Sequence, residues 1–325
     1  MDLYINSYGT YLHKRDDMFE LEIEGKKTKI SPAKVRSIVI STHAFITTDV
    51  VKLAVDNNID IVLTDDFGNP YGRFWHSRFG STANIRRRQL EVFENDEGIE
   101  LIKGWIINKI EKSTKHLKDL EYKRSGKADE IERIIDEIKQ YVDKVSDVTG
   151  TIDEKRNTIQ GYEGNASKLY YSILSKLMPD PYKFEGRSFR PAKDEFNCML
   201  NYAFGVLYGK VEKACVIAGL DPFVGIMHTD NYNKKSLVFD LIENYRDYGL
   251  RVVFSMFSRK KVNQSFFEKI KGGMKLNRDG KKALLVELSE YFDKTTNYDG
   301  RNITHLNIIQ HDCHKIANKL IGRGE

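Results

Sequence analysis

Residues 59–74, IDIVLTDDFGNPYGRF, join a short β-branched apolar run to a second short run through a cluster of turn-forming residues. A run of this length, bounded by Asp, Gly, Asn and Pro, predicts a strand, a turn and a further strand. Upstream, VRSIVIS (35–41) and FELEIEG (19–25) have the same alternating or β-branched character. One helix is predicted from Thr48 to Asn58, where apolar residues recur at helical spacing behind a threonine cap.

The pattern changes to long amphipathic segments after about residue 80, which predicts a boundary there. Residues 1–80 are therefore expected to form a β-rich, sandwich-like domain, and residues 81–325 a larger all-α domain, giving an α+β fold. Helix breaks are predicted at SGKADE (125–130) and VTGTIDE (148–154), and a long loop at 179–195. The clearest helical spacing is shown by Ile102, Ile106, Ile107 and Ile110, and by Ile131, Ile134, Ile135 and Ile138.

The composition is that of a globular protein, and its cysteines indicate a reducing compartment. Three cysteines at wide spacing are expected to be buried, unpaired thiols, and no apolar run of about 18 residues occurs, so a cytoplasmic protein with no membrane contact is expected. The net charge of +5 is carried by Arg86–Arg88 and by the basic stretch from Arg259 to Lys282. Such patches attract polyanions, although a solvated surface explains either patch taken alone.

Acidic and imidazole side chains occur in three apolar stretches that lie far apart in the sequence: Glu163, His228, and Asp240 with Glu243. A carboxylate in an apolar environment costs several kcal/mol, roughly, unless a partner or a cation satisfies it. Asp240 and Glu243 stand at i and i+3 of a predicted helix and should share one face. Arg246 or a metal ion could then compensate the two charges.

Glu163 is expected to begin a helix, with Gly164, Ala166 and Ser167 leaving room for the close approach of another helix. Stabilisation by the helix dipole is an equally simple explanation for a carboxylate in a first turn. His228 alone would more often be a structural histidine. Each residue by itself is therefore weak support for a functional site.

Together, a Glu, a His and further carboxylates suit Mg²⁺ or Mn²⁺ better than zinc, with open positions for water and phosphate oxygens. Near a basic surface, such a site indicates phosphoryl-transfer chemistry. No P-loop or dinucleotide-binding motif occurs. The pair His311 and His314 in HDCHK has no further ligands nearby in the sequence, and a structural role is favoured for it.

At these residues the sequence resembles the Cas1 family, the CRISPR-associated integrases of spacer acquisition. The resemblance covers essentially the whole chain and rests on several segments found in the family's order. These are VRSIVIS, IDIVLTDDFGNPYGRF, EGNASKLYY, RSFRPAKDEFNCMLNYAFGVLYG, GLDPFVGIMH and SLVFDLIENYR.

The resemblance implies that Glu163, His228 and Glu243 bind the metal, with Asp240 beside it as an orienting or charge-balancing group. It also implies double-stranded and branched DNA substrates, a homodimer joined through the strand-rich domains, and assembly with the small partner Cas2. The chain departs from the family at RPAKDEFN, where a proline pair is common but Arg190, Asp194 and Asn197 are kept. It also has Phe204 where Tyr is common and Asn244 where Pro is common.

The sequence therefore predicts a metal-dependent endonuclease and integrase, in which a DNA 3′-hydroxyl attacks a phosphodiester. Glu163, His228, Asp240 and Glu243 are the predicted catalytic residues, and Arg187, Arg190 and Arg246 are predicted to position phosphates. Two alternatives stay open. The chain could be a non-catalytic DNA-binding scaffold whose carboxylates form salt bridges to Arg246 or another base, or it could be an unrelated nuclease acting on RNA.

Overall fold

The computed structural model describes residues 1–75, 82–93, 95–122, 125–189, 191–229, 232 and 234–322. In that part of the chain, none of the helices combines the length and the apolar character needed to cross a bilayer. The three cysteines are all buried and unpaired, as expected.

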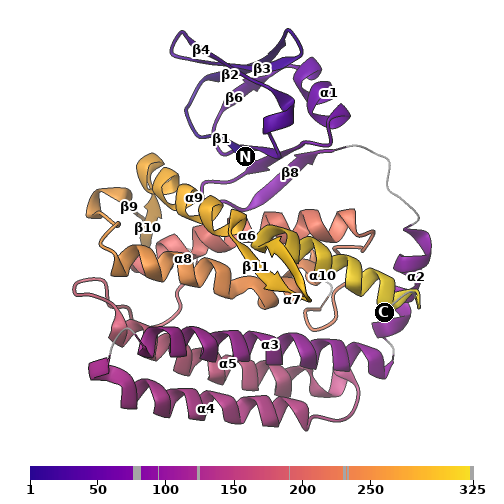
Figure 1. The fold of residues 1–325 in the computed structure, drawn as a ribbon, viewed down its shortest axis with the longest axis vertical. Coiled ribbons are helices and arrows are strands. Elements are labelled where there is room, and N and C mark those ends of the chain that lie inside the picture. The colour runs from indigo at the N-terminus through magenta and orange to yellow at the C-terminus, as the bar shows by residue number, and fades with distance from the viewer. Residues whose placement is uncertain are drawn as a thin grey trace.

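The described N-terminal residues form two four-stranded sheets and one helix (Figure 1). The first sheet has the order β1-β5-β7-β8, with β8 antiparallel to its neighbour, and the second has the order β4-β3-β2-β6. Their elements are β1 (Asp2–Ile5), β2 (Thr10–Arg15), β3 (Met18–Ile23), β4 (Lys26–Ile30), β5 (Ser37–Ile40), β6 (Ala44–Ile46), α1 (Thr48–Asp56), β7 (Asp60–Thr64) and β8 (Pro70–Phe74).

Side chains from both sheets fill one core, which confirms the predicted strand-rich start of the chain. Leu3, Ile38 and Ile61 lie in register across β1, β5 and β7, and they share this core with Leu12 and Phe19 of the second sheet. The predicted turn and final strand at 65–74 are also found, and helix α1 covers nearly the whole of the predicted range. The domain boundary expected at residue 80 lies outside the described residues, between β8 and the next helix.

The rest of the described chain is mainly helical, as predicted, but it also contains two short β-hairpins. They are β9 (Phe267–Ile270) with β10 (Gly273–Leu276), and β11 (Thr295–Tyr298) with β12 (Arg301–Thr304). The helices are α2 (Ala83–Phe93), α3 (Asp96–Glu121), α4 (Ala128–Ser146), α5 (Ile152–Leu177), α6 (Glu195–Ile217), α7 (Ser236–Ile242), α8 (Arg246–Ser258), α9 (Arg278–Asp293) and α10 (His305–Leu320).

These helices form two stacked layers beneath the strand-rich region (Figure 1). Helices α3, α4 and α5 make the lower layer, and α6 lies with α8, α9 and α10 between that layer and the sheets. The predicted isoleucine stripes of α3 and α4 face inward, except that Ile107 is only partly buried. The long loop predicted between α5 and α6 is present, and both predicted helix breaks overlap the observed ones, at 122–127 and 147–151.

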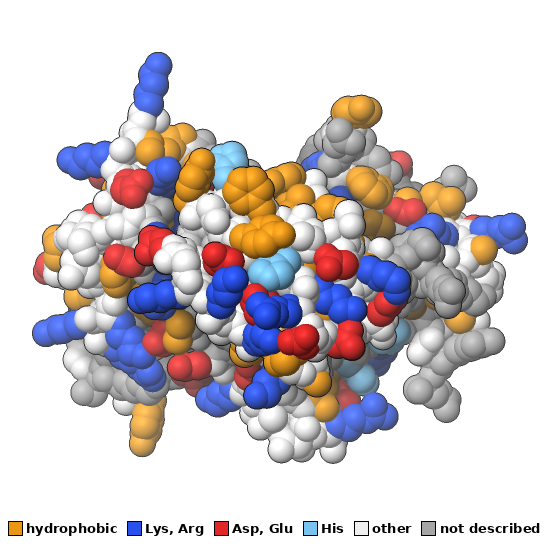
Figure 2. Space-filling view, turned by 90° about the horizontal axis from the view of Figure 1, so that it is seen from above, with side chains coloured by type: hydrophobic (Ala, Val, Ile, Leu, Met, Phe, Trp, Pro, Cys, Tyr) orange, Lys and Arg blue, Asp and Glu red, His pale blue; other side chains and the backbone are white. Residues whose placement is uncertain are grey.

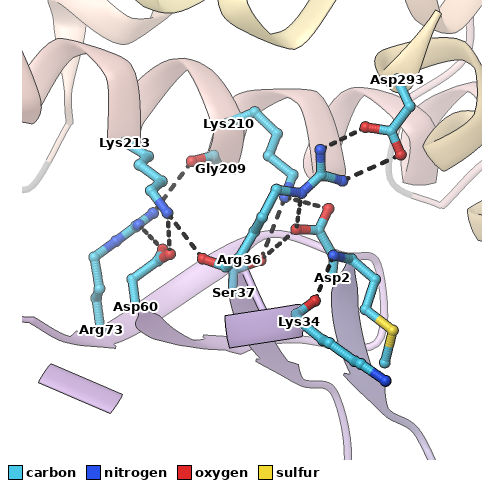
Figure 3. A network of polar contacts seen from close by, with 11 residues as sticks. Asp2, Lys34, Arg36, Ser37, Asp60, Arg73, Gly209, Lys210, Lys213 and Asp293 are labelled. Carbon is cyan, nitrogen blue, oxygen red and sulfur yellow. Dashed lines mark hydrogen bonds and ion pairs between the residues drawn. The ribbon is translucent and has the colours of Figure 1, made fainter. Parts of the chain in front are cut away.

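The strand-rich region is attached to α6 by a network of buried ion pairs (Figure 3). Asp60 of β7 accepts from Lys213 Nζ at 2.5 Å and also pairs with Arg73 of β8. Asp2 of β1 accepts from Lys210 Nζ at 2.7 Å. Because these lysines project from α6 on successive turns, the helix holds the end of the first sheet at several points.

Replacing Asp60 by Asn should lower the free energy of unfolding by about 3 to 5 kcal/mol, because Arg73 and Lys213 would then lose a buried anionic partner. Urea denaturation measures this change. The matched control is Asp16→Asn, since the Asp16 side chain is 71% exposed in its pair with Lys29. The control should leave the unfolding free energy close to that of the native protein, because an exposed ion pair contributes little. Equal effects of the two substitutions would contradict the proposed anchoring.

Candidate functional site

Two of the predicted metal ligands, Glu163 and Glu243, meet around the ammonium group of Lys109. Lys109 of α3 donates to Glu243 Oε2 at 2.5 Å and also to Glu163 Oε1. Glu163 Oε1 also accepts from Ser167 Oγ at 2.7 Å, one turn further along α5. Arg246 Nε donates to Glu243 Oε1 at 2.7 Å. Glu163 and Glu243 thus share the Lys109 ammonium group, although they lie 54 and 134 positions from Lys109 in the chain.

Glu243 is buried, whereas the side chains of Lys109, Glu163 and Arg246 are partly exposed, at 15%, 21% and 24%. Burial raises the pKa of Glu243, but the charges and hydrogen bonds of Arg246 and Lys109 outweigh it and bring the pKa down to about 2. Burial likewise lowers the pKa of Lys109, but the two carboxylates raise it overall. With Glu163 ionised as well, two negative and two positive charges balance, and the group of four has no net charge.

The backbone that carries Glu243 is fixed by neighbours on both sides. Glu243 opens the short 3-10 turn η3 (Glu243–Tyr245) between α7 and α8. Lys112 Nζ donates to the carbonyl oxygen of Asn244 at 2.5 Å, and Asn108 Nδ2 donates to the Asn244 side chain at 2.8 Å. On the other side, the Tyr245 hydroxyl donates to Asp312 Oδ2 at 2.8 Å. The Asn244 side chain therefore attaches η3 to α3.

Glu163 does not begin a helix, which corrects the sequence-based prediction. Helix α5 starts at Ile152, behind a capping box formed by Thr151 and Glu154, so Glu163 lies in its middle. Stabilisation by the helix N-terminus is therefore not available to Glu163. The expected close approach at Gly164 is also wrong, since a Cβ built there would meet no atom within 4 Å.

His228 and Asp240 form a second cluster. Asp240 is buried and accepts from the backbone amides of Ile226 at 2.5 Å, Met227 at 3.1 Å and His228 at 3.0 Å. The same carboxylate lies 2.6 Å from His228 Nδ1. The loop can pack this closely only with glycine at 225, because a Cβ there would lie 2.3 Å from Ser236 Cβ.

Asp240 and Glu243, which were expected to lie on one helix face, have different hydrogen-bond partners. The hydrogen bonds of Asp240 go to the loop that carries His228, whereas those of Glu243 go to Lys109 and Arg246. With Nδ1 donating to Asp240, the imidazole is held in the tautomer whose Nε2 carries the lone pair. That is the form of histidine that binds metals.

The donor set has the chemistry of a divalent-cation site, and two of its members already converge on one cation. Two carboxylates and an oriented imidazole suit Mg²⁺ or Mn²⁺. Within the residues that the structure describes, however, no three His, Cys, Asp or Glu side chains lie close enough together to hold a metal ion. The structure thus joins Glu163 to Glu243 and leaves His228 in its own cluster with Asp240.

A basic cavity of about 640 Å³ opens beside Glu163 along α5. Gly164, Ser167 and Tyr171 form its inner wall, and the missing side chain at Gly164 contributes to the space. Five basic residues line it against a single acidic one, Glu185, which favours an anionic occupant. The five are Lys127, Lys168, Lys176, Lys183 and Arg187.

The predicted phosphate-binding arginines have different surroundings. Arg187 is held by Asn201 Oδ1 at 2.8 Å and by Asn197, whose amide is capped by Asp194 at 2.7 Å. The retained residues of RPAKDEFN therefore build the start of α6 and anchor Arg187, which also faces the cavity. Arg246 lies over the Phe204 ring at 4.8 Å and pairs with Glu243. Arg190 lies outside the described residues.

Sequence reasoning did not identify Lys109, Lys112, Asn108 or Asp312. No local pattern marks these residues, since Lys109 and Lys112 belong to a helix that carries several other lysines. Their roles depend on helices that are distant in sequence. The pair His311 and His314 in α10 belongs to no metal-binding group among the described residues.

Comparison with known proteins identifies relatives along nearly the whole chain. The profile of the family described as "CRISPR associated protein Cas1" matches residues 3–290. A CRISPR-associated endonuclease Cas1 from Archaeoglobus fulgidus is 32% identical over 322 residues, which cover 95% of this chain and 93% of that protein. One from Saccharolobus solfataricus is 28% identical over 90% of this chain and 89% of its own length.

Solved structures support the same fold. A casposase bound to an integration product superposes with a TM-score of 0.88 at 24% identity, covering 100% of this chain and 92% of that one. A Cas1 protein from Thermotoga maritima superposes with a TM-score of 0.82 at 22% identity, covering 99% and 97%. At these identities the two structures are informative about the fold alone.

Proposed function

This chain belongs to the Cas1 family of CRISPR-associated proteins, and from this premise we propose that it is a metal-dependent DNA endonuclease and integrase. It would insert short DNA fragments into a CRISPR array by attack of a DNA 3′-hydroxyl on a phosphodiester. The observation that carries the proposal is the match, at 32% identity over 95% of the chain, to a relative named an endonuclease. Glu163 and Glu243, far apart in the sequence, also meet at one point of the fold, as two ligands of one metal ion must.

Glu163, Glu243 and His228 would hold Mg²⁺ or Mn²⁺, with Asp240 acting as a positioning residue through His228 Nδ1. The ion, when bound, supplies Lewis-acid polarisation of the scissile phosphodiester and activation of the attacking hydroxyl. Asp240 fixes the imidazole tautomer before substrate arrives. The lysines of the basic cavity would hold phosphates next to Glu163, and Arg246 would keep Glu243 ionised and oriented.

A DNA-binding scaffold remains the second candidate, because one observation favours it. The salt bridges that it requires are present: Glu243 pairs with both Arg246 and Lys109, and Glu163 pairs with Lys109. In a scaffold these pairs would be permanent. In an enzyme, one of the cations must give way to a metal ion.

Strand transfer on branched DNA, measured with Mn²⁺ and with EDTA, tests the proposal. An integrase joins labelled donor DNA to the target in Mn²⁺ and not in EDTA, while a scaffold binds the same DNA equally under both conditions without joining it. An RNA substrate of the same sequence, assayed in parallel, tests the third candidate. Cleavage confined to RNA would contradict the proposal.

The exposed aromatic side chains around β6 support a homodimer formed through the strand-rich region. Tyr8 is 81% exposed and Phe45 68% exposed, and Tyr11 lies opposite Phe45 in the pairing of β2 with β6. Strand β6 is also the edge of its sheet, where another strand can add. Figure 2 looks onto this region from above and shows hydrophobic side chains gathered there with histidines among them. Assembly of such dimers with Cas2 is proposed from the family alone.

Replacing Phe45 by Glu should weaken self-association by at least about a hundredfold, because a charge would be placed in the centre of an apolar contact. Sedimentation equilibrium measures the dimer dissociation constant. The matched control is Val286→Glu on α9, where the native side chain is 49% exposed outside this surface. A dimer that persists unchanged in the Phe45 variant would mean that the interface lies elsewhere.

A further inference from the structure

We propose that Lys109 is an exchangeable counter-ion, which occupies the space between Glu163 and Glu243 until a divalent cation and a DNA phosphate arrive together. Binding of the cation would displace the ammonium group, and the phosphate would become its new partner. This inference rests on the proposed function and adds a mechanism that couples metal binding to DNA binding.

The contacts of Lys109 differ from those of the neighbouring lysine on the same helix. Its ammonium group donates to the side chains of Glu163 and Glu243, which are the proposed metal ligands. Lys112, one turn later, instead donates to a backbone carbonyl oxygen of η3. Lys112 therefore holds the backbone in place, whereas Lys109 neutralises the two carboxylates that a metal would need.

The charge balance of the site explains why a divalent cation has to replace the Lys109 ammonium group. Glu163, Glu243, Lys109 and Arg246 have no net charge when all four are ionised. A divalent cation added to this group would leave a net charge of +2 in a buried site, which is strongly unfavourable. Departure of the Lys109 ammonium or arrival of an anionic phosphate reduces that charge. DNA provides the phosphate. Its arrival therefore favours binding of the divalent cation and departure of the Lys109 ammonium group.

The surroundings of Lys109 adjoin the basic cavity. Lys109, Glu243 and Arg246 line a small cavity whose wall includes Ser167 and Tyr171. The same two residues line the larger basic cavity beside Glu163. A phosphate bound in that larger cavity would lie across a shared wall from Lys109. Because a lysine side chain is long and flexible, its charged end can change partners without movement of α3.

The test measures Mn²⁺ affinity directly, by electron paramagnetic resonance of free Mn²⁺ in the absence of DNA. Lys109→Gln removes the competing charge and should bind Mn²⁺ at least about tenfold more tightly than the native protein. Lys109→Arg keeps the charge and should stay within about twofold of the native affinity. Lys115→Gln, which alters an exposed lysine of the same helix, is the matched control and should also be unchanged.

A second titration includes branched DNA with 3′-dideoxy ends, which cannot carry out strand transfer. The native protein should gain Mn²⁺ affinity on adding this DNA, and Lys109→Gln should gain several-fold less, because coupling between two ligands is reciprocal. An equal gain in the two proteins would overturn the proposed exchange.

Two further outcomes are decisive. If Lys109→Gln binds Mn²⁺ no more tightly than the native protein, or fails to fold even with Mn²⁺ present, Lys109 is a permanent structural partner and the inference is wrong. If the variant unfolds at a lower temperature without metal and recovers in Mn²⁺, the inference is supported. Failure of the proposed function has a different signature, because the native protein would then join no donor DNA to the target in Mn²⁺, whatever the Mn²⁺ affinity of Lys109→Gln.

Discussion

The Glu163→Gln variant is expected to lose at least about a hundredfold in Mn²⁺-dependent strand transfer while its thermal unfolding stays close to that of the native protein. Glutamine has the same shape and can still accept the hydrogen bond from Ser167. It cannot provide the negative charge that a divalent cation requires. Because the Glu163 side chain is 21% exposed, substitution leaves no fully buried group without water or a partner.

Strand-transfer rates and circular-dichroism melting curves should be measured on the same preparations. The matched control is Glu100→Gln, which removes an acidic charge from α3 at a side chain that is 64% exposed. That control should change the rate by less than about threefold. Strand transfer at the native rate in Glu163→Gln would remove Glu163 from the catalytic site and would favour the scaffold.

The strand-rich region could be predicted from the sequence because its signals are local. The turn at 65–70 and the β-branched runs around it specify strand positions within a few residues. The start of α5 was open to the same kind of argument, since Thr151 and Glu154 have the spacing of a capping box. The prediction that the helix starts at Glu163 was wrong, since α5 runs through the glycines at 161 and 164 without a break.

The residue types of the candidate site could be predicted from the sequence, but the contacts between those residues could not. Buried carboxylates need partners, and that argument correctly indicated Arg246 for Glu243. It could not identify Lys109, because the partner of a buried charge can come from any helix that packs nearby. The separate partners of Asp240 and Glu243 could not be predicted for a related reason. Helix spacing places side chains on a face, but backbone amides at 226–228 compete for the carboxylate of Asp240.

His228→Ala is expected to reduce strand transfer by at least about a hundredfold with a change of less than about 1 kcal/mol in unfolding free energy. The side chain is 25% exposed, and its truncation leaves Asp240 its three backbone donors. Asp240→Asn should behave differently. The buried Asp240 carboxylate accepts from four N–H groups, and in asparagine one of its two oxygens is replaced by an NH₂ donor. This loss of an acceptor should cost about 3 to 5 kcal/mol of stability in addition to activity.

The contrast between the two variants separates a metal ligand from a positioning residue. If His228 binds the cation, His228→Ala should also weaken Mn²⁺ binding in the absence of DNA, and urea denaturation should show an intact fold. If His228 serves only to pack the loop against α7, both variants should lose stability together and Mn²⁺ affinity should follow stability alone. A stable His228→Ala protein with native Mn²⁺ affinity and native rate would contradict the ligand assignment and leave Glu163 and Glu243 as the remaining proposed ligands.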